Sequence, residues 1–436
     1  MTPVTSPRAW LAQTLVCALL SAAAAPALAQ TQADLFNDST VQDIHLTVSS
    51  RDWEALKAHA DENTYYAADL RWRGLTVRNV GIRSRGAGSR NGVKPGLRVD
   101  MNRYVDQSFL GLRALILDNA YTDPSALREV LAMKLFARAG LPAPREAHAR
   151  LLVNNEYAGL YIVVEPLDRT FVARVFGDAE GNVENGGFLY EYSWVREYGF
   201  EYLGPALEPY AEIFEPRTRE TDAISRLYQP LEALTRLIND TAPDRVEPAV
   251  GALLDLPALV RFLAVQQVAG EIDGFIGNWG MSNFYLYRFR DNRPAQVLPW
   301  DADHSFWALD LPIDHRLETN VLTRSIMAVP ALRRLYLETL VSVSALVAGG
   351  AGADGRGWLE QEADRLAAAI APLVAADPVT PFTFAEFDGN LRGLRGLLRT
   401  RPPYVACAAQ AVLDPAAPQS CPVPAPGDIP APMLTR

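Results

Sequence analysis

Histidine, cysteine and surplus positive charge are scarce in this sequence, and each shortage argues against a class of site. The 436 residues include 3 cysteines and 5 histidines, and 41 Lys and Arg stand against 51 Asp and Glu, for a formal net charge of −10. A surface that coats nucleic acid, or a polybasic membrane patch, needs clustered positive charge, so neither is expected. The histidines lack ligand spacing, which argues against a His-based zinc site. Because the net charge is negative, a ligand that carries phosphate must be bound by a local group of cations.

Three common catalytic motifs are also missing. The sequence contains no G-x-x-x-x-G-K-[ST] phosphate loop, no G-x-G-x-x-G dinucleotide fingerprint and no G-x-S-x-G nucleophile elbow. P-loop, Rossmann and serine-hydrolase chemistry are therefore not indicated. No internal repeat is found either.

A long hydrophobic run occurs only once. Residues 10–29 are apolar, follow a basic residue and end in Ala27-Leu28-Ala29, a small-x-small pattern typical of a secretory signal. We expect residues 1–29 to be this signal, and the mature protein to be exported to the periplasm, the exterior or the cell surface without a transmembrane helix. Lipid modification of Cys17 is the weaker alternative, because apolar residues continue past it.

The other two cysteines lie close together near the C-terminus. Cys407 and Cys421 bracket the Pro-containing stretch CAAQAVLDPAAPQSC. In an oxidising compartment, a disulfide that closes this short loop is favoured over metal binding by the pair.

Predicted elements divide the chain into a β-rich half and a helical half, and 49% hydrophobic residues suffice for a sizeable core. Alternating apolar residues predict single strands over 44–48 and 187–192, an antiparallel meander over 69–72, 75–82, 96–101 and 114–117, and a hairpin formed by 149–153 and 159–164. The first half also contains a predicted helix over 52–59. Another begins at Asp123-Pro124, a cap followed by proline, and stops at Gly140.

From about residue 222 the apolar residues recur at helical spacing. Further helices are expected near 331–346, 358–373 and 384–398, with a hairpin over 284–298 inserted among the helices. This order predicts an α+β fold with a cleft between its halves. We expect a β-rich lobe over 30–165, a helical lobe over 166–400 and a Pro-rich tail over 401–436.

The stretch VLPWDADHSFW places Asp301 and Asp303 directly after a predicted strand. Alternate residues of an extended segment project to one side, so both carboxylates can converge on one point. A hard divalent cation such as Mg²⁺ or Mn²⁺ takes oxygen ligands of this kind. The alternative is that one aspartate caps a turn or pairs with an arginine.

A second polar cluster follows a long apolar helix, in EIDGFIGNWGMSNFYLYRF. Asp273 lies in this Gly/Asn-rich loop and can orient a hydroxyl nucleophile or accept its proton, while an asparagine just before the next strand can complete a metal site. In the alternative interpretation Asp273 and Asn278 only satisfy backbone groups in an Asx-turn loop.

The loop RSRGAGSRNGVKPGLRV concentrates glycines and cations in the β-rich half. Gly86 and Gly88 permit backbone N–H groups to face an anion, and Arg85 and Lys94 are among the cations that can meet phosphates there. A long hairpin loop without a ligand is the alternative interpretation.

Two glutamates complete the candidate set. Glu129 lies beside the buried face of the helix that follows Asp123-Pro124 and can reach inward to hold a lysine, or it can be a solvated residue near a helix N-terminus. Glu165 ends the strand GLYIVVE and precedes a proline, which suggests a linker between the halves. These features follow the order in which the parts of a kinase active site occur along the chain. The cationic glycine loop and the lysine come first, then the helix glutamate and the linker, and last the Asp/Asn loop and the final aspartate.

Three stretches resemble the CotH kinase family of atypical secreted kinases, over roughly residues 40–350. They are VGIRSRGAGSRNGVKPGLRVDMNRY, the segment around NNEYAGLYIVVEPLD, and DGFIGNWGMSNFYLYR with VLPWDADHSFW. The resemblance implies a bilobal kinase-like fold that binds ATP with Mg²⁺ or Mn²⁺ and phosphorylates protein hydroxyls.

By the same resemblance, Asp273 is similar to the family's catalytic aspartate, Asn283 to its metal-binding asparagine and Asp301 to its metal aspartate, with Asp303 as a further candidate ligand. Because Asp273 and Asn283 are ten residues apart, Asn278 is a competing ligand.

Lys94 is expected to contact the phosphates with Glu129 as its helix partner, and Arg98 is an alternative cation. The kinase motifs H-R-D and D-F-G are absent, and the sequences EID and WDAD stand in their places. Two other functions therefore stay open: an inactive kinase-like scaffold for envelope or coat assembly, and a metal-dependent hydrolase built on the same aspartates.

Overall fold

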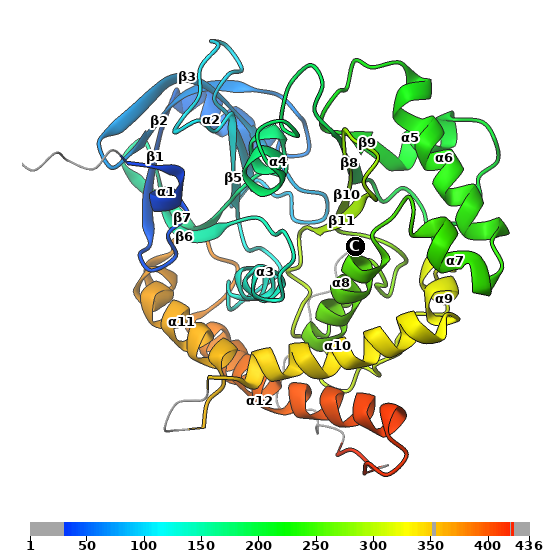
Figure 1. Cartoon of the computed structure of the whole chain (residues 1–436). Helices are drawn as coiled ribbons and strands as arrows, with labels where there is room; N and C mark the ends of the chain where they lie inside the picture. The colour runs from blue at the N-terminus through cyan, green and yellow to red at the C-terminus, as the bar shows by residue number, and fades with distance from the viewer. Residues whose placement is uncertain (1–29, 351–354, 419, 423–436) are drawn as a thin grey trace, which may run out of the picture.

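A closed β-barrel and a smaller sheet lie side by side above a layer of long helices (Figure 1). The computed structural model describes residues 30–350, 355–418 and 420–422. The expected signal, residues 1–29, lies outside this range. Within the described part of the chain, no helix is both long and apolar enough to span a membrane.

The barrel is formed by seven strands in the order β1-β2-β3-β4-β5-β7-β6. Their bounds are β1 Gln42–Val48, β2 Tyr66–Trp72, β3 Leu75–Ser84, β4 Leu97–Asp100, β5 Ala114–Asp118, β6 Glu146–Val153 and β7 Glu156–Val164. Buried and accessible residues alternate along β1, and Leu46, Leu70 and Trp72 pack in the interior. Asn154 and Asn155, with φ of 53° and 68°, make the tight turn between β6 and β7.

The smaller sheet has the order β11-β10-β8-β9, and all its pairs are antiparallel. Its strands are β8 Phe188–Tyr192, β9 Phe214–Pro216, β10 Phe284–Arg288 and β11 Gln296–Pro299. The predicted hairpin over 284–298 is therefore confirmed as β10 and β11. Tyr285 of β10 packs edge-on against Trp300, which follows β11, with 5.5 Å between the ring centroids.

Helices cover the barrel ends and build the second half. They are α1 Gln32–Leu35, α2 Ser50–Ala58, α3 Arg128–Arg138, α4 Arg169–Phe176, α5 Glu208–Ile213, α6 Ile224–Asp240, α7 Pro243–Val250, α8 Leu256–Ala269, α9 Val321–Met327, α10 Pro330–Ala348, α11 Trp358–Ala376 and α12 Phe384–Leu413. Helix α8 is almost wholly buried, because α10, α12 and β11 pack around it. One apolar cluster extends from α3 through this helical half and joins the two parts of the molecule.

The predicted α+β class is confirmed, with a β-rich first part and a mainly helical second part in an arrangement consistent with a bilobal kinase-like fold. The predicted meander is confirmed by the consecutive antiparallel pairs from β2 to β5, and a parallel pair between β1 and β6, which was not predicted, closes the sheet into a barrel. A parallel pair between strands so far apart in sequence leaves no local signal. Helix α12 continues to Leu413, past the expected start of the tail.

Helix α3 begins at Arg128 and not at Pro124. The carboxylate of Asp123 accepts hydrogen bonds from the backbone N–H groups of Ser125, Leu127 and Arg128, so it does cap the helix, but from a wider turn. Ala126 within this turn has φ of 52°, a left-handed conformation that no helix continues.

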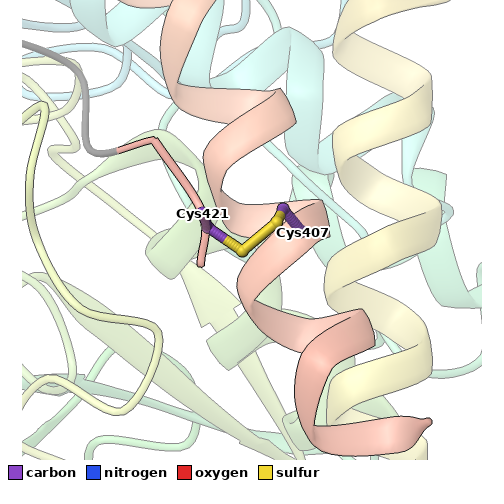
Figure 2. Close-up of a disulfide and its surroundings, with 2 residues drawn as sticks. All are labelled: Cys407 and Cys421. Atoms are coloured by element: carbon purple, nitrogen blue, oxygen red, sulfur yellow. A yellow bond between two sulfur atoms is a disulfide. The ribbon is translucent and has the colours of Figure 1, made fainter. Parts of the chain in front are cut away.

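The predicted disulfide between Cys407 and Cys421 is confirmed (Figure 2). Cys407 lies in α12, and the described chain after α12 turns back so that the two Cα atoms are 5.7 Å apart. The bond ties the start of the Pro-rich tail to the helix.

Candidate active site

Three carboxylates from separate elements meet between the barrel and the smaller sheet. They are Asp118 at the end of β5, Glu129 in the first turn of α3 and Asp301 just after β11, and one oxygen of each lies within 4.8 Å of the others. We call these three residues the acid cluster. Asp301 has φ of 49°, so the chain turns through a left-handed residue soon after β11, at the start of the segment Asp301-Ala302-Asp303, which we call the DxD segment.

The acid cluster places three carboxyl groups close together in a poorly solvated position. Burial and the neighbouring Asp303 raise the pKa of Asp301 to about 8. Burial and the nearby acids also raise the pKa of Glu129 well above its usual value. Carboxylate oxygens held close together are the donor set that a hard divalent cation prefers, so the residues present fit Mg²⁺ or Mn²⁺.

Arg85 pairs directly with one member of this cluster. Its Nη1 lies 3.0 Å from Oδ2 of Asp118, and its guanidinium stands over the ring of Trp300 at 5.8 Å from the centroid. Arg85 begins the glycine-rich loop between β3 and β4, and Gly86 has φ of 114°, which only glycine adopts without strain. The loop thus brings a cation to the carboxylates. Gly88 lies in an exposed turn of the same loop.

Lys94, the expected phosphate lysine, does not pair with Glu129. Its Nζ forms a buried ion pair with Asp377 at 2.9 Å, and the same carboxylate accepts the backbone N–H of Leu160. The predicted Lys94–Glu129 pair was therefore wrong as a contact. Asp377 follows α11 and is far away in sequence, so no local pattern could announce it.

Arg98 and Glu165 also have partners outside the acid cluster. Arg98 pairs with Asp100 at 2.9 Å. Glu165 is fully buried, and its carboxylate holds Arg145 at 2.7 Å and Arg174 at 2.6 Å. Glu165, directly after β7, thus ties Arg145 before β6 to the last turn of α4, which is a structural role for the linker position. Their contribution to nucleotide binding stays a prediction.

Asp273 and Asn283 are brought together in the loop between α8 and β10. Nδ2 of Asn283 donates to the backbone carbonyl of Asp273 at 2.9 Å and to its Oδ2 at 3.3 Å. Glu271 fixes this loop. Its Oε1 accepts a hydrogen bond from the backbone N–H of Asp273 at 2.7 Å, and its Oε2 accepts one from the hydroxyl of Ser305 at 2.7 Å. Burial raises the pKa of Glu271 to about 7.

His304 links this loop to the DxD segment, a role that the sequence analysis missed. Its Nδ1 lies 3.1 Å from Oδ1 of Asp303 and 3.8 Å from Oδ2 of Asp273. Burial disfavours the charged ring, but the surrounding carboxylates, Asp303 foremost, raise the pKa of His304 to about 10. Asp303 also accepts a hydrogen bond from Thr122. An imidazolium therefore stands between the two aspartates.

Asn278, the competing ligand, points elsewhere. It is exposed, and its Oδ1 faces Nε2 of His315 at 2.8 Å. Between the two asparagines, the structure therefore brings Asn283 and not Asn278 to Asp273.

The sequence analysis also missed Asp118. A signal was present, because Asp118 follows the apolar strand Ala114–Leu117 just as Asp301 follows its own strand. A strand-terminal aspartate is common, however, and only the meeting of Asp118 with Glu129 and Asp301 singles this one out.

Two comparisons with known proteins cover this site. The inner spore coat protein H of Bacillus subtilis (strain 168) is 21% identical over 338 residues, which is 75% of this chain and 86% of that protein. The CotH kinase protein family matches residues 82–405, a range that begins in β3, ends in α12 and includes the acid cluster together with Asp273. The match covers well over half of the sequence, so the chain belongs to the CotH kinase protein family.

Proposed function

We propose that this protein is an exported kinase that transfers the γ-phosphate of ATP to a hydroxyl of a protein substrate. The observation that carries the proposal is the meeting of Asp301 with Asp118 and Glu129, while Asp273 and Asn283 form a second polar group connected to it through His304 and Asp303. Family membership supports a kinase, and the disulfide supports an oxidising compartment.

The residues divide the chemistry between them. A divalent cation held by Asp301, Asp118 and Glu129, with Oδ1 of Asn283 as a further ligand, would neutralise phosphate charge. Arg85 adds a fixed positive charge beside this site. Positioning and charge neutralisation supply most of the catalysis in phosphoryl transfer, so these fixed groups are the ones that the reaction needs.

Asp273 performs the proton step. Its carboxylate orients the acceptor hydroxyl and takes its proton as the hydroxyl oxygen bonds to the γ-phosphorus. The bond from that phosphorus to the β–γ bridging oxygen breaks, and ADP leaves with the electron pair. The His304 imidazolium stands 3.8 Å from the Asp273 carboxylate and holds it in place.

The test is transfer of labelled phosphate. The mature protein is incubated with γ-labelled ATP and Mn²⁺ or Mg²⁺, and labelled protein is identified by mass spectrometry. Asp273→Ala should lower transfer by about 10²-fold or more, because general-base catalysis contributes at least that much. Asp291→Ala is a matched control, since Asp291 is an exposed aspartate that pairs only locally with Arg293.

Two other outcomes identify other functions. Release of inorganic phosphate without transfer, equally from nucleotides and from other phosphate esters, would favour the metal-dependent hydrolase. No effect of ATP and cation on thermal stability would favour an inactive scaffold, for which the name of the Bacillus relative, a spore coat protein, is the supporting observation.

A separate prediction concerns the phosphate-contacting cation. Arg85→Met should weaken ATP binding by about tenfold or more, because it removes a charge next to the acid cluster, and a hydrogen bond to a charged group contributes about 1.5–3 kcal/mol. Lys94→Met should change ATP affinity much less and mainly lower stability, since it leaves Asp377 buried without its cation. Calorimetric titration with an ATP analogue and a urea melt separate the two effects. The reverse pattern would restore Lys94 as the phosphate lysine.

A further inference from the structure

Arg401 of α12 is a fully buried cation whose hydrogen bonds go to backbone carbonyls. Within the described chain its guanidinium donates from Nε to Val268 at 3.1 Å, from Nη1 to Leu309 at 2.8 Å and to Leu311 at 3.1 Å, and from Nη2 to Gln267. Charged side chains are almost never fully buried unless they are paired. The positions of these four carbonyls therefore indicate what the buried cation does.

Two of the carbonyls belong to the last turn of α8, the helix that leads into the loop of Asp273. The last carbonyls of a helix lack partners within the helix and carry its partial negative charge, so a cation is favourable there. Gly270 caps this helix with φ of 62°, and an added Cβ would lie 3.0 Å from Nε of Arg401. Arg401 thus packs directly on the point at which α8 passes into the loop.

The other two carbonyls belong to the chain that follows the DxD segment. This stretch also contacts the end of α8 directly, because the backbone N–H of Phe306 donates to the carbonyl of Ala269 at 2.7 Å. A guanidinium is planar and presents its N–H donors as a rigid fork, so one arginine can hold carbonyls from both stretches at fixed positions. Arg401 therefore connects them a second time, from a helix that is distant in sequence.

We propose that Arg401 is a positioning residue for phosphate transfer, which holds the loop of Asp273 and the chain after the DxD segment in the arrangement that the reaction requires. Arg401 acts through the backbone of these two stretches. The inference rests on the proposed function for its effect on catalysis, but not for its effect on the two stretches. Residues from 401 onward were expected to form a tail, whereas this first one belongs to the interior.

The first experiment measures label transfer from ATP at saturating nucleotide, together with the Kd of an ATP analogue, in the mature full-length protein. Arg401→Met removes the fork and should lower kcat by about 10- to 100-fold, because a misplacement of about 1 Å can cost that much. Nucleotide affinity should stay near that of the wild type, since Arg85 and Glu129 belong to other elements. Arg392→Met is the matched control, because Arg392 lies in the same helix but is exposed and pairs locally with Asp388.

Arg401→Lys separates charge from geometry. A lysine ammonium keeps the charge but concentrates its three donors at one point, so it cannot hold carbonyls from both stretches as the fork does. This variant should still transfer phosphate about tenfold more slowly than the wild type. If Arg401→Met does not fold, Arg401→Lys takes its place in every measurement.

Hydrogen exchange gives a readout that does not require activity. The free energy of local opening differs between parts of a protein, so the loss of one connection raises exchange where that connection lay. In Arg401→Met, backbone N–H groups over 270–278 and 304–311 should exchange faster than in the wild type. Exchange in the barrel strands should not change.

Wild-type kcat in Arg401→Met, with wild-type exchange in both stretches, would overturn the proposal. Equal losses of kcat and nucleotide affinity, with faster exchange throughout the barrel, would also overturn it, because that pattern indicates general destabilisation. Failure of the proposed function looks different. The wild type would then transfer no phosphate, while the local rise in exchange would still identify Arg401 as the residue that fixes the two stretches.

Discussion

Replacing Asp301 with asparagine is expected to eliminate cation-dependent phosphate transfer, to roughly 10⁻⁴ of the wild-type rate. A metal ion supplies several kcal/mol of transition-state charge stabilisation, and each 1.36 kcal/mol is a factor of ten. Asp301 lies within ligand distance of Asp118 and Glu129, and the charge of Asp303 acts on it. The measurements are the initial rate of label transfer and the thermal shift with Mn²⁺.

The stability of this variant without metal gives the control. Burial raises the pKa of Asp301 to about 8, above the value in an unfolded chain. A carboxyl whose folded pKa is raised weakens the folded state as pH increases above the unfolded pKa, so removal of its charge should not lower stability at pH 7. Asp301→Asn should therefore melt at or above the wild-type temperature while it loses the Mn²⁺-induced shift. An unchanged Mn²⁺ shift would contradict the assigned ligand role.

The second large effect is expected from Asp123→Ala, which should lower the free energy of unfolding by about 3–5 kcal/mol. Asp123 forms a buried ion pair with Arg128 and accepts three backbone N–H groups at the start of α3. Arg128 is fully buried, and its guanidinium lies 3.5 Å from the centroid of the Trp307 ring. Without Asp123 a charge stays buried with no carboxylate to offset it, and the helix loses its cap.

Urea melts of two further variants separate these contributions. Asp123→Asn keeps an acceptor for the backbone N–H groups but loses the charge, so its loss should be smaller. In the double variant Asp123→Ala with Arg128→Met, the unpaired charge is gone, and the loss should be smaller than for Asp123→Ala alone. If the double variant is the less stable of these two, the buried-charge explanation is wrong. Because α3 carries Glu129, Mn²⁺ affinity should fall with Asp123→Ala as well.

Several local features of this protein were predictable from the residues next to each other in sequence. Alternation of apolar residues predicted most barrel strands, and helical spacing predicted the helices after residue 222. The short loop between Cys407 and Cys421 predicted their disulfide. Asp273 and Asp301 stood out because polar groups follow apolar segments there, and strand ends and loops are where such groups reach a common site.

Partnerships between distant residues were not predictable. Lys94 and Glu129 lie at expected positions, but Lys94 is held by Asp377 from the C-terminal helices, while Glu129 joins Asp118 and Asp301. Each of those pairings depends on how α11, β5 and β11 pack. The entropic cost of closing a chain loop grows only slowly with loop length, so a partner from a distant part of the chain can replace the expected one.

The amino-acid order alone determined the α+β class, the inserted hairpin and the disulfide, because each depends on residues a few positions apart. Only the tertiary structure decided which carboxylates lie close enough to share a cation, and which arginine accompanies them. Those relations are set by how the barrel and the smaller sheet come together, where side chains from β5, from α3 and from just after β11 converge.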